Sequence, residues 1–380
     1  MSYHVLTVKQ PSGPPEPRLF RTLRADLGSV FGDVNKRGVG HEVRRTFDDL
    51  EKFYLSEELR RRLTTMSSVS RWLHRFWWLL KGLLMKMTPA RRVLLALGLF
   101  LLVTGVQQIH FSTRVITFNL PVIGDILLVI VLMLELKDKL VARDELEAGR
   151  VVQLALMPQQ SPDVPGWDVW TYTEPANDVG GDLVDYVPLG EGRHGIALGD
   201  VAGKALPAAL LMVKLQATLR ALIPQFGTLA ELGAGVNRIL TRDGLTNRFA
   251  TLVYCVVSET SGDVRVLNAG HFPPLIARPA SLDEMARGSI ALGIIDDATF
   301  SETQADLAPG DVLIAYSDGV TEAVNSAGDF FGEERLRAAI EAAAGQPAGA
   351  IGARILESLV SFVGDAPPHD DVSVVVMRRL

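Results

Sequence analysis

The apolar residues of this chain are concentrated in one part of it. Residues 93–106 are almost wholly apolar, and a second run covers residues 115–136, interrupted by Asn119, Pro121 and Asp125. A membrane-spanning helix needs about 20 predominantly apolar residues. The pattern therefore predicts a transmembrane helical hairpin over residues 91–136. The alternative is that these residues form helices of a soluble domain.

The residues before this predicted hairpin are basic and amphipathic. Apolar positions recur at helical spacing between Glu42 and Met66, which predicts a helical region over residues 41–90. Residues 71–81 combine tryptophans with cations, a mixture that favours the lipid headgroup level. Residues 1–40 contain a proline-rich stretch and are predicted to be disordered.

Positive charge lies on both sides of the predicted hairpin. Nine Lys or Arg residues lie between Arg60 and Arg92 and three between Lys137 and Arg143, whereas the connector carries only Arg114. By the positive-inside rule both termini are expected to face the cytoplasm. The predicted location is the cytoplasmic membrane, with membrane lipid as a partner.

Residues 137–158 form a charged, helix-favouring segment that ends at Pro158. We expect a linker helix that continues the second hairpin helix, and a homodimer could form through it. The remaining residues, 159–380, have a different texture, with short apolar runs broken by Gly, Pro and Asp. They are predicted to form a separate domain.

The short apolar runs of this domain predict strands, several of them joined by hairpin turns. Strands and helices come in clusters rather than in strict alternation, which indicates an α+β domain of antiparallel sheets with helices packed outside. The predicted strands cover 167–172, 183–189, 195–198, 252–257, 264–267, 312–315 and 372–377, and the predicted helices cover 205–222, 229–242, 333–344 and 348–363.

Composition narrows the possible functions. The net charge of −6 combines +9 in residues 1–92 with −15 in residues 93–380. This distribution is not that of a uniformly basic nucleic-acid-binding protein, so no nucleic-acid partner is expected. The single cysteine, Cys255, excludes an internal disulfide framework and a Cys-rich zinc cluster.

Four strand-like pieces of the domain lead into or follow aspartate. The aspartates are Asp182, Asp200, Asp318 and the pair Asp370–Asp371. A single Asp after a strand usually marks only a turn, but carboxylates gathered at one sheet edge repel one another unless cations lie between them. Oxygen ligands of this kind select Mg²⁺ or Mn²⁺, and two such ions can clamp a phosphoryl oxygen.

Other chemistries fit the sequence less well. The Gly-x-Gly-x-x-Gly match at 190–195 lies between two predicted strands and opens no helix, so it predicts a hairpin loop rather than a dinucleotide site. The P-loop-like segment 199–205 has the wrong glycine spacing and ends in Ala205. Cys255 is expected to be a core residue, and His271 a hydrogen-bonded loop residue, with a phosphate contact as the minority interpretation.

The ordered set of motifs resembles the SpoIIE/RsbU-type branch of the PPM metal-dependent serine/threonine phosphatases. The resemblance covers roughly residues 150–380, including Gln153–Pro158. The motifs that carry it are 177–182, 199–204, 268–271, 316–323, 331–332 and 370–372.

That resemblance implies an αββα sandwich with two Mn²⁺ or Mg²⁺ ions at the sheet edges. By motif, Asp182, Asp200 as bridging ligand, the Val201 carbonyl, Asp318 and Asp370 would bind the metals. Asp371 is the alternative to Asp370. A water activated by the metals would be the nucleophile, so no side chain is expected to be catalytic in its own right.

Two departures accompany the resemblance. The branch usually has glycine where Ala205 stands; because that position opens a helix, alanine is expected to be acceptable there. The domain is also expected, like the branch, to lack a basic side chain dedicated to phosphate.

The resemblance further implies a phosphorylated regulatory protein as substrate, such as an anti-sigma-factor antagonist. Together with the predicted hairpin, it suggests a membrane-anchored protein phosphatase. The alternative is a catalytically inactive phosphatase-like module that captures a signalling partner at the membrane.

Overall fold

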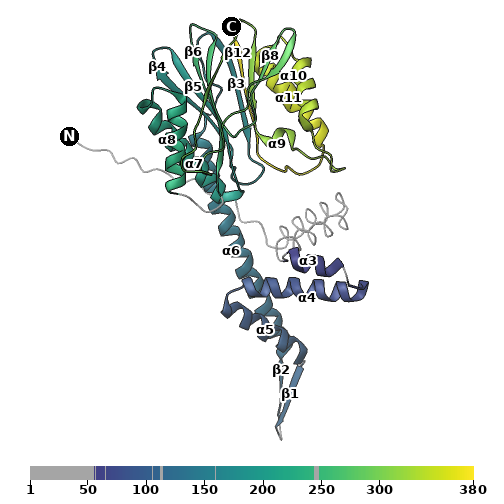
Figure 1. The fold of residues 1–380 in the computed structure, drawn as a ribbon. Helices are drawn as coiled ribbons and strands as arrows, with labels where there is room; N and C mark the ends of the chain where they lie inside the picture. Colours follow the sequence, from purple (N-terminus) through teal and green to yellow (C-terminus); the bar gives the residue numbers. More distant parts are fainter. Residues whose placement is uncertain are drawn as a thin grey trace, which may run out of the picture. The chain divides into compact units, whose positions relative to one another are not determined.

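The computed structural model describes residues 55–380 apart from residues 56, 65, 105, 112–113, 159 and 244–247. The chain divides into two compact units, residues 1–137 and residues 138–380 (Figure 1). The predicted disorder of residues 1–40 lies outside the described residues, as does the start of the predicted helical region 41–90.

Where the structure describes it, the first unit consists of helices and a β-hairpin. Its described elements are α3 (Glu57–Thr64), α4 (Ser68–Lys86), α5 (Pro89–Thr104), β1 (Val106–Phe111), β2 (Arg114–Asn119) and the beginning of α6 (Leu120–Leu156). The two apolar runs are therefore not two helices joined by a short turn. The end of the first run and the start of the second pair as antiparallel strands, and α6 begins only at Leu120. Pro121 explains this start, because proline fits the first turn of a helix and disrupts its interior.

Helices α5 and α6 approach closely through two glycines. A Cβ atom at Gly124 would lie 2.7 Å from the Gly98 carbonyl oxygen and 3.0 Å from the Leu102 nitrogen. At the other end of the pair, the Arg91 guanidinium contacts the Glu135 carboxylate at 3.0 Å. Small residues at such a crossing are typical of helices that associate within a membrane.

The helices α4, α5 and α6 carry many large apolar side chains that are exposed, among them Trp72, Trp77, Phe100, Ile126 and Leu132. Length and composition alone do not make these helices spanning segments: among the described residues, only Ala205–Gln225 is long and apolar enough for that. The Ala205–Gln225 segment belongs to the second unit, where its apolar side chains pack against a sheet. α5 has only 16 residues, about 24 Å of helix against a hydrocarbon core of about 30 Å.

The second unit contains two five-stranded sheets in which all neighbouring strands are antiparallel. Every strand expected from the sequence is present. The first sheet has the order β10 (Glu302–Asp306), β7 (Asp263–Ala269), β6 (Ala250–Ser258), β5 (Arg193–Val201), β4 (Leu183–Gly190), and the second has the order β3 (Trp167–Glu174), β12 (Val372–Arg379), β11 (Val312–Tyr316), β8 (Leu275–Arg278), β9 (Ser281–Glu284).

Helices cover the outer face of each sheet (Figure 1). α7 (Ala205–Leu222), with the short η1 (Ile223–Gln225), and α8 (Leu229–Arg242) pack on the first sheet, and α10 (Gly332–Ala342) and α11 (Ala348–Val363) pack on the second. The predicted bounds of α7, α8 and α11 are confirmed. The αββα sandwich expected from the sequence is thus the observed fold.

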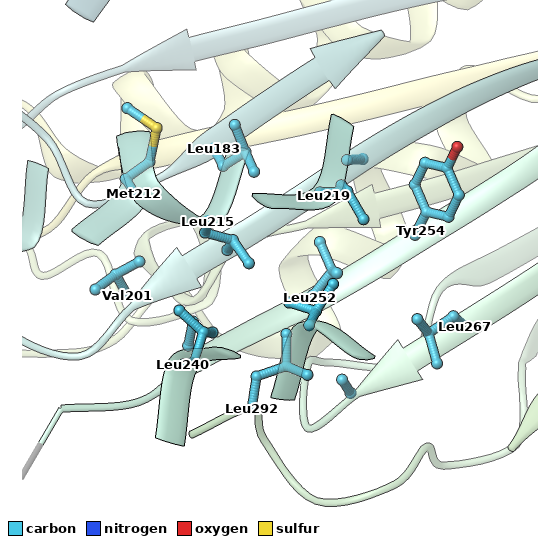
Figure 2. Packing of buried hydrophobic residues seen from close by; sticks show 14 of the residues in the cluster. Leu183, Val201, Met212, Leu215, Leu219, Leu240, Leu252, Tyr254, Leu267 and Leu292 are labelled. Atoms are coloured by element: carbon cyan, nitrogen blue, oxygen red, sulfur yellow. The ribbon is translucent and has the colours of Figure 1, made fainter. Parts of the chain in front are cut away.

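Apolar side chains alternate between two layers of core along each central strand. In β6, Val253 and Cys255 face the core between the sheets, whereas Leu252 and Tyr254 face α7 and α8. Figure 2 shows this outer layer, where Leu215 and Leu219 of α7 meet the sheet. Burial on both faces explains why the central strands read as continuous apolar runs.

The sequence patterns missed three strands of this domain, β8, β9 and β10. β9 and β10 are edge strands with polar, partly exposed side chains, so they carry no apolar run. The Gly-x-Gly-x-x-Gly segment is a hairpin turn between β4 and β5, as predicted. Gly190, Glu191 and Gly192 all have positive φ there.

Candidate active site

The predicted ligands come from strands of both sheets. Asp200 lies in β5 directly opposite Thr251 of β6, and Asp182 immediately precedes β4. In the other sheet, Asp318 begins the short helix α9 (Asp318–Thr321) after β11, and Asp370 precedes β12. Because β11 and β12 are paired, their connecting ends adjoin, and Ser317 Oγ donates to the Asp371 carbonyl oxygen at 3.1 Å.

Mutual repulsion is evident in the pKa values of these carboxyl groups. Burial, followed by the charges of Asp318, Asp370 and Asp371, raises the pKa of Asp200 to about 7. Burial, followed by Asp370, also raises the pKa of Asp318. Such a group of carboxylates is ionised together only when cations offset the charge.

Asp182 is the most enclosed of the predicted ligands. Its side chain is buried, and Oδ2 has no hydrogen-bond partner. Burial raises the pKa of Asp182, and the charges of Asp200 and Asp371 act in the same direction. A buried carboxylate oxygen without a donor fits a hard divalent cation.

Asp370 and Asp371 differ in their contacts. Asp371 accepts hydrogen bonds from the backbone nitrogens of Ala176 at 2.7 Å and Gly181 at 2.5 Å, so both of its oxygens hold the segment before β4. Asp370 Oδ2 instead lies 3.0 Å from the Lys204 ammonium. The carboxylate of Asp371 thus holds the backbone before β4, whereas the carboxylate of Asp370 contacts a cationic side chain.

The carboxylates of the predicted ligands lie near one another, but their side chains are not arranged as a preformed metal site. Across the described ranges, no group of three or more His, Cys, Asp or Glu side chains is arranged to hold a metal ion. The donor chemistry nevertheless fits two hard cations, because Asp182 has an unpartnered oxygen and the other carboxylates repel one another. The assignment of Asp182, Asp200, Val201, Asp318 and Asp370 as ligands stays a prediction.

His271 is a structural link between the two sheets. Its Nδ1 lies 2.7 Å from Thr251 Oγ1 and its Nε2 lies 3.0 Å from the Tyr316 carbonyl oxygen. Burial lowers the pKa of His271 to about 4, so the ring is neutral at pH 7. These contacts support the expected role of a hydrogen-bonded loop histidine and brace the backbone beside Asp200 and Asp318.

Gln153 belongs to the segment Gln153–Pro158, which the sequence analysis included in the resemblance without giving its residues a role. Its side chain, near the C-terminal end of α6, is buried and donates to the Gly180 carbonyl oxygen at 2.6 Å. It also accepts a hydrogen bond from the Gly180 nitrogen at 3.1 Å. The linker helix is therefore fastened to the segment that carries Asp182, and a glutamine at this spacing before Pro158 was the signal available in the sequence.

The expectation for Ala205 was wrong. Ala205 opens α7 with φ of +59°, in the left-handed region. An L-residue with a Cβ is strained there, whereas glycine is not. The usual glycine of the branch at this position thus reflects the backbone conformation and not the helix that follows.

Cys255 has no role in the chemistry. It lies in β6, fully enclosed in the core between the sheets, and burial raises the pKa of its thiol to about 12. A thiol in this state is not a nucleophile at neutral pH.

Known proteins resemble this chain in sequence. The model of the Stage II sporulation protein E (SpoIIE) family matches residues 190–380. Protein IcfG of Synechocystis is 28% identical over 273 aligned residues, which cover 64% of this chain and 43% of IcfG. Phosphoserine phosphatase RsbU of Bacillus subtilis is 27% identical over 240 residues, covering 62% of this chain and 70% of RsbU. The chain therefore spans less than half the length of IcfG.

Solved structures agree with the fold. The RsbU and RsbW domains of Rv1364c from Mycobacterium tuberculosis superpose with a TM-score of 0.51 and 27% identity, covering 59% of this chain and 62% of that one. The SiaA-PP2C domain of Pseudomonas aeruginosa gives a TM-score of 0.57 at 21% identity, covering 64% of this chain and 98% of that domain.

These likenesses place the second unit among the serine/threonine phosphatase domains of PP2C type, the class also called PPM. Within that class the chain belongs to the SpoIIE family, since the family model matches half of its residues. The family that the motifs predicted is therefore confirmed.

Proposed function

We propose that this chain is a membrane-anchored protein phosphatase that hydrolyses phosphoserine or phosphothreonine on a regulatory partner protein. The gathering of Asp200, Asp318 and Asp370 at one edge of the sandwich is the observation that carries the activity; burial, with the added charges of Asp318 and Asp370, raises the pKa of Asp200. The likeness to phosphoserine phosphatase RsbU supports the substrate class. The family resemblance suggests an anti-sigma-factor antagonist as the partner.

The side chains at such a site would have two roles, binding the metal ions and positioning the ligands. Asp182, Asp200, Asp318 and Asp370, with the Val201 carbonyl, would hold two Mn²⁺ or Mg²⁺ ions. When bound, such ions neutralise charge on phosphoryl oxygens and lower the pKa of a coordinated water. The other residues near the site position these ligands: Asp371 fixes the segment before Asp182, and neutral His271 fixes the strand ends beside Asp200 and Asp318.

Activity can be tested on the full-length protein with Mn²⁺ and a phosphoserine-containing protein. Loss of an outer-shell partner typically costs 10–100-fold, so loss of a ligand in Asp200→Asn or Asp318→Asn should cost about 100-fold or more. Asp297→Asn, which changes an exposed aspartate away from the strand ends, should leave activity unchanged. Full activity of Asp200→Asn and Asp318→Asn would refute the metal assignment. Metal binding without any turnover would favour the inactive binding module.

The first unit supports the membrane anchor. α5 and α6 cross at Gly98 and Gly124, as membrane helices often do, while Trp72 and Trp77 expose amphipathic rings on α4. Exposed apolar surface of this extent calls for lipid or another apolar partner. With the basic flanks facing the cytoplasm, the phosphatase domain would also be cytoplasmic.

Cell fractionation tests the anchor. The full-length protein should sediment with membranes after alkaline carbonate extraction and enter the supernatant only with detergent. Recovery in the detergent-free supernatant would instead indicate a soluble helical domain.

A homodimer through the linker part of α6 is also proposed. Leu140, Val141, Val151 and Val152 are all at least 45% exposed on this helix. Apolar positions that recur on an exposed helix favour pairing with a second helix. Light scattering of the detergent-solubilised chain should give the mass of two copies, and the mass of one copy would exclude the dimer.

A further inference from the structure

A cleft of about 420 Å³ opens beside the predicted metal ligands. Asp200, Asp318, Glu284, Glu333 and Arg287 are the charged residues that line it. Among the described residues that line this cleft, Arg287 is thus the one permanent cation against four carboxylates. A phosphate group entering the cleft would meet that negative charge.

Arg287 is available for a ligand. It is exposed, and its guanidinium has no hydrogen bond or ion pair within the described parts of the chain. The carboxylate of Glu284, which lines the same cleft, already pairs with another arginine, because the Arg337 guanidinium lies 3.3 Å from it. Arg287 is therefore not neutralised by the wall on which it sits.

The backbone around Arg287 is held in place. The Ser289 nitrogen donates to the Asn268 carbonyl oxygen at 2.8 Å. A Cβ at Gly288 would collide with the same oxygen, so the chain passes Asn268 at a distance that only glycine allows. Asn268 Oδ1 in turn accepts a hydrogen bond from the His271 nitrogen at 2.9 Å.

This connection reaches both strands that carry predicted ligands. His271 contacts Thr251, which pairs with Asp200, and the carbonyl of Tyr316, two residues before Asp318. The position of the Arg287 backbone is thus set by the same hydrogen bonds that brace the ligand-bearing strands. An exposed arginine that lines a cleft, on backbone fixed in this way, is suited to bind an anion with its planar guanidinium.

We propose that Arg287 binds the phosphoryl group of the substrate in this cleft. This inference rests on the proposed phosphatase function, and it differs from the expectation that the domain lacks a basic side chain for phosphate. The chemistry recognised is a phosphate dianion, which the guanidinium can contact through two parallel N–H donors. A carboxylate elsewhere on the partner protein is the competing ligand, and the choice of substrate separates the two.

The test compares Arg287→Ala and Arg287→Lys with wild-type full-length protein. With p-nitrophenyl phosphate, which offers only a phosphoryl group, Arg287→Ala should raise KM about 10-fold or more while kcat changes much less. The inhibition constant of inorganic phosphate should rise by a similar factor. Arg287→Lys should recover part of the loss, because it keeps the charge but not the fork. Arg238→Ala removes another exposed arginine, in α8, and should change neither constant.

The outcomes separate this inference from the proposed function. If Arg287→Ala raises KM only for a phosphoprotein and leaves p-nitrophenyl phosphate and inorganic phosphate unaffected, the arginine binds a carboxylate and the inference is wrong. Unchanged constants for all three would also overturn it. If the wild type shows no turnover, the proposed function fails. Calorimetric titration with inorganic phosphate then still decides the inference, since only a phosphate-binding arginine makes the affinity of Arg287→Ala weaker than that of Arg238→Ala.

Discussion

Replacing Ala205 by glycine should stabilise this protein, although it places glycine in the first turn of a helix. In an ordinary helix interior, Ala→Gly costs about 1 kcal/mol, because glycine loses more backbone entropy on folding. Ala205 is different, since its φ of +59° lies in the left-handed region. That conformation costs an L-residue roughly 1–2 kcal/mol and costs glycine almost nothing.

The two effects have opposite signs and similar size, and the strain is the larger. We expect Ala205→Gly to increase the free energy of unfolding by about 0.5–1 kcal/mol. A domain of 150–250 residues shifts by about 2–4 °C in Tm per kcal/mol, so Tm should rise by roughly 1–4 °C. Ala217→Gly is the matched control, because Ala217 is an exposed alanine inside the same helix α7. It should lower Tm by about 2–4 °C.

Scanning calorimetry of the full-length protein and the two variants measures both shifts under one set of conditions. The informative quantity is the difference between the two Ala→Gly substitutions, expected to be roughly 3–8 °C. Equal losses of Tm in Ala205→Gly and Ala217→Gly would show that Ala205 is not strained, and the left-handed start of α7 would then be refuted.

Three further predictions concern buried polar contacts. Gln153→Leu leaves both backbone groups of Gly180 without partners and should cost about 2–4 kcal/mol, seen as a lower Tm, whereas the same change at the exposed Gln225 should cost less than about 0.5 kcal/mol. Arg220→Ala leaves the buried Asp185 carboxylate unpaired and should cost about 3 kcal/mol in denaturant unfolding; a loss below about 1 kcal/mol would contradict a buried charge. The pKa of His271 in the folded state, about 4, lies below its ordinary 6.5, so the unfolded chain takes up this proton first. The contribution of neutral His271 to the free energy of unfolding is therefore complete above pH 6.5 and decreases as the pH falls towards 4. At pH 5 the free energy of unfolding is lower by about 2 kcal/mol for this reason. His271→Gln should flatten the decline of Tm between pH 7.5 and 5, and an unchanged slope would exclude this assignment.

The sequence by itself determined the central architecture of the phosphatase domain. β5, β6, β11 and β12 are buried on both faces, so they appear in the sequence as short apolar runs, and the Gly, Pro and Asp residues that bound these runs indicated strands. The helices α7, α8 and α11 were predicted with their observed bounds, because turn residues and Pro mark their ends. The order of the aspartate motifs identified the family, since each of them lies at the end of a strand: β4, β5, β11 or β12.

Only the tertiary structure decided features that depend on contacts distant in sequence. Asp370 and Asp371 are equivalent in the pattern, yet Asp371 holds the backbone of Gly181, 190 residues away. Likewise, a dihedral angle such as that of Ala205 follows from how β5 must turn into α7, which no propensity encodes.

The first unit and the cleft show the same limit. Periodicity cannot tell a strand from a helix in a short apolar run, so the hairpin of β1 and β2 was read as the ends of two helices. Arg287 has no motif around it; its place beside Asp200 and Asp318 follows from the packing of Gly288 against Asn268. The apolar residues of a strand or helix show directly in the sequence which positions will be buried. Contacts between polar groups from distant parts of the chain, in contrast, form only when the two sheets pack together.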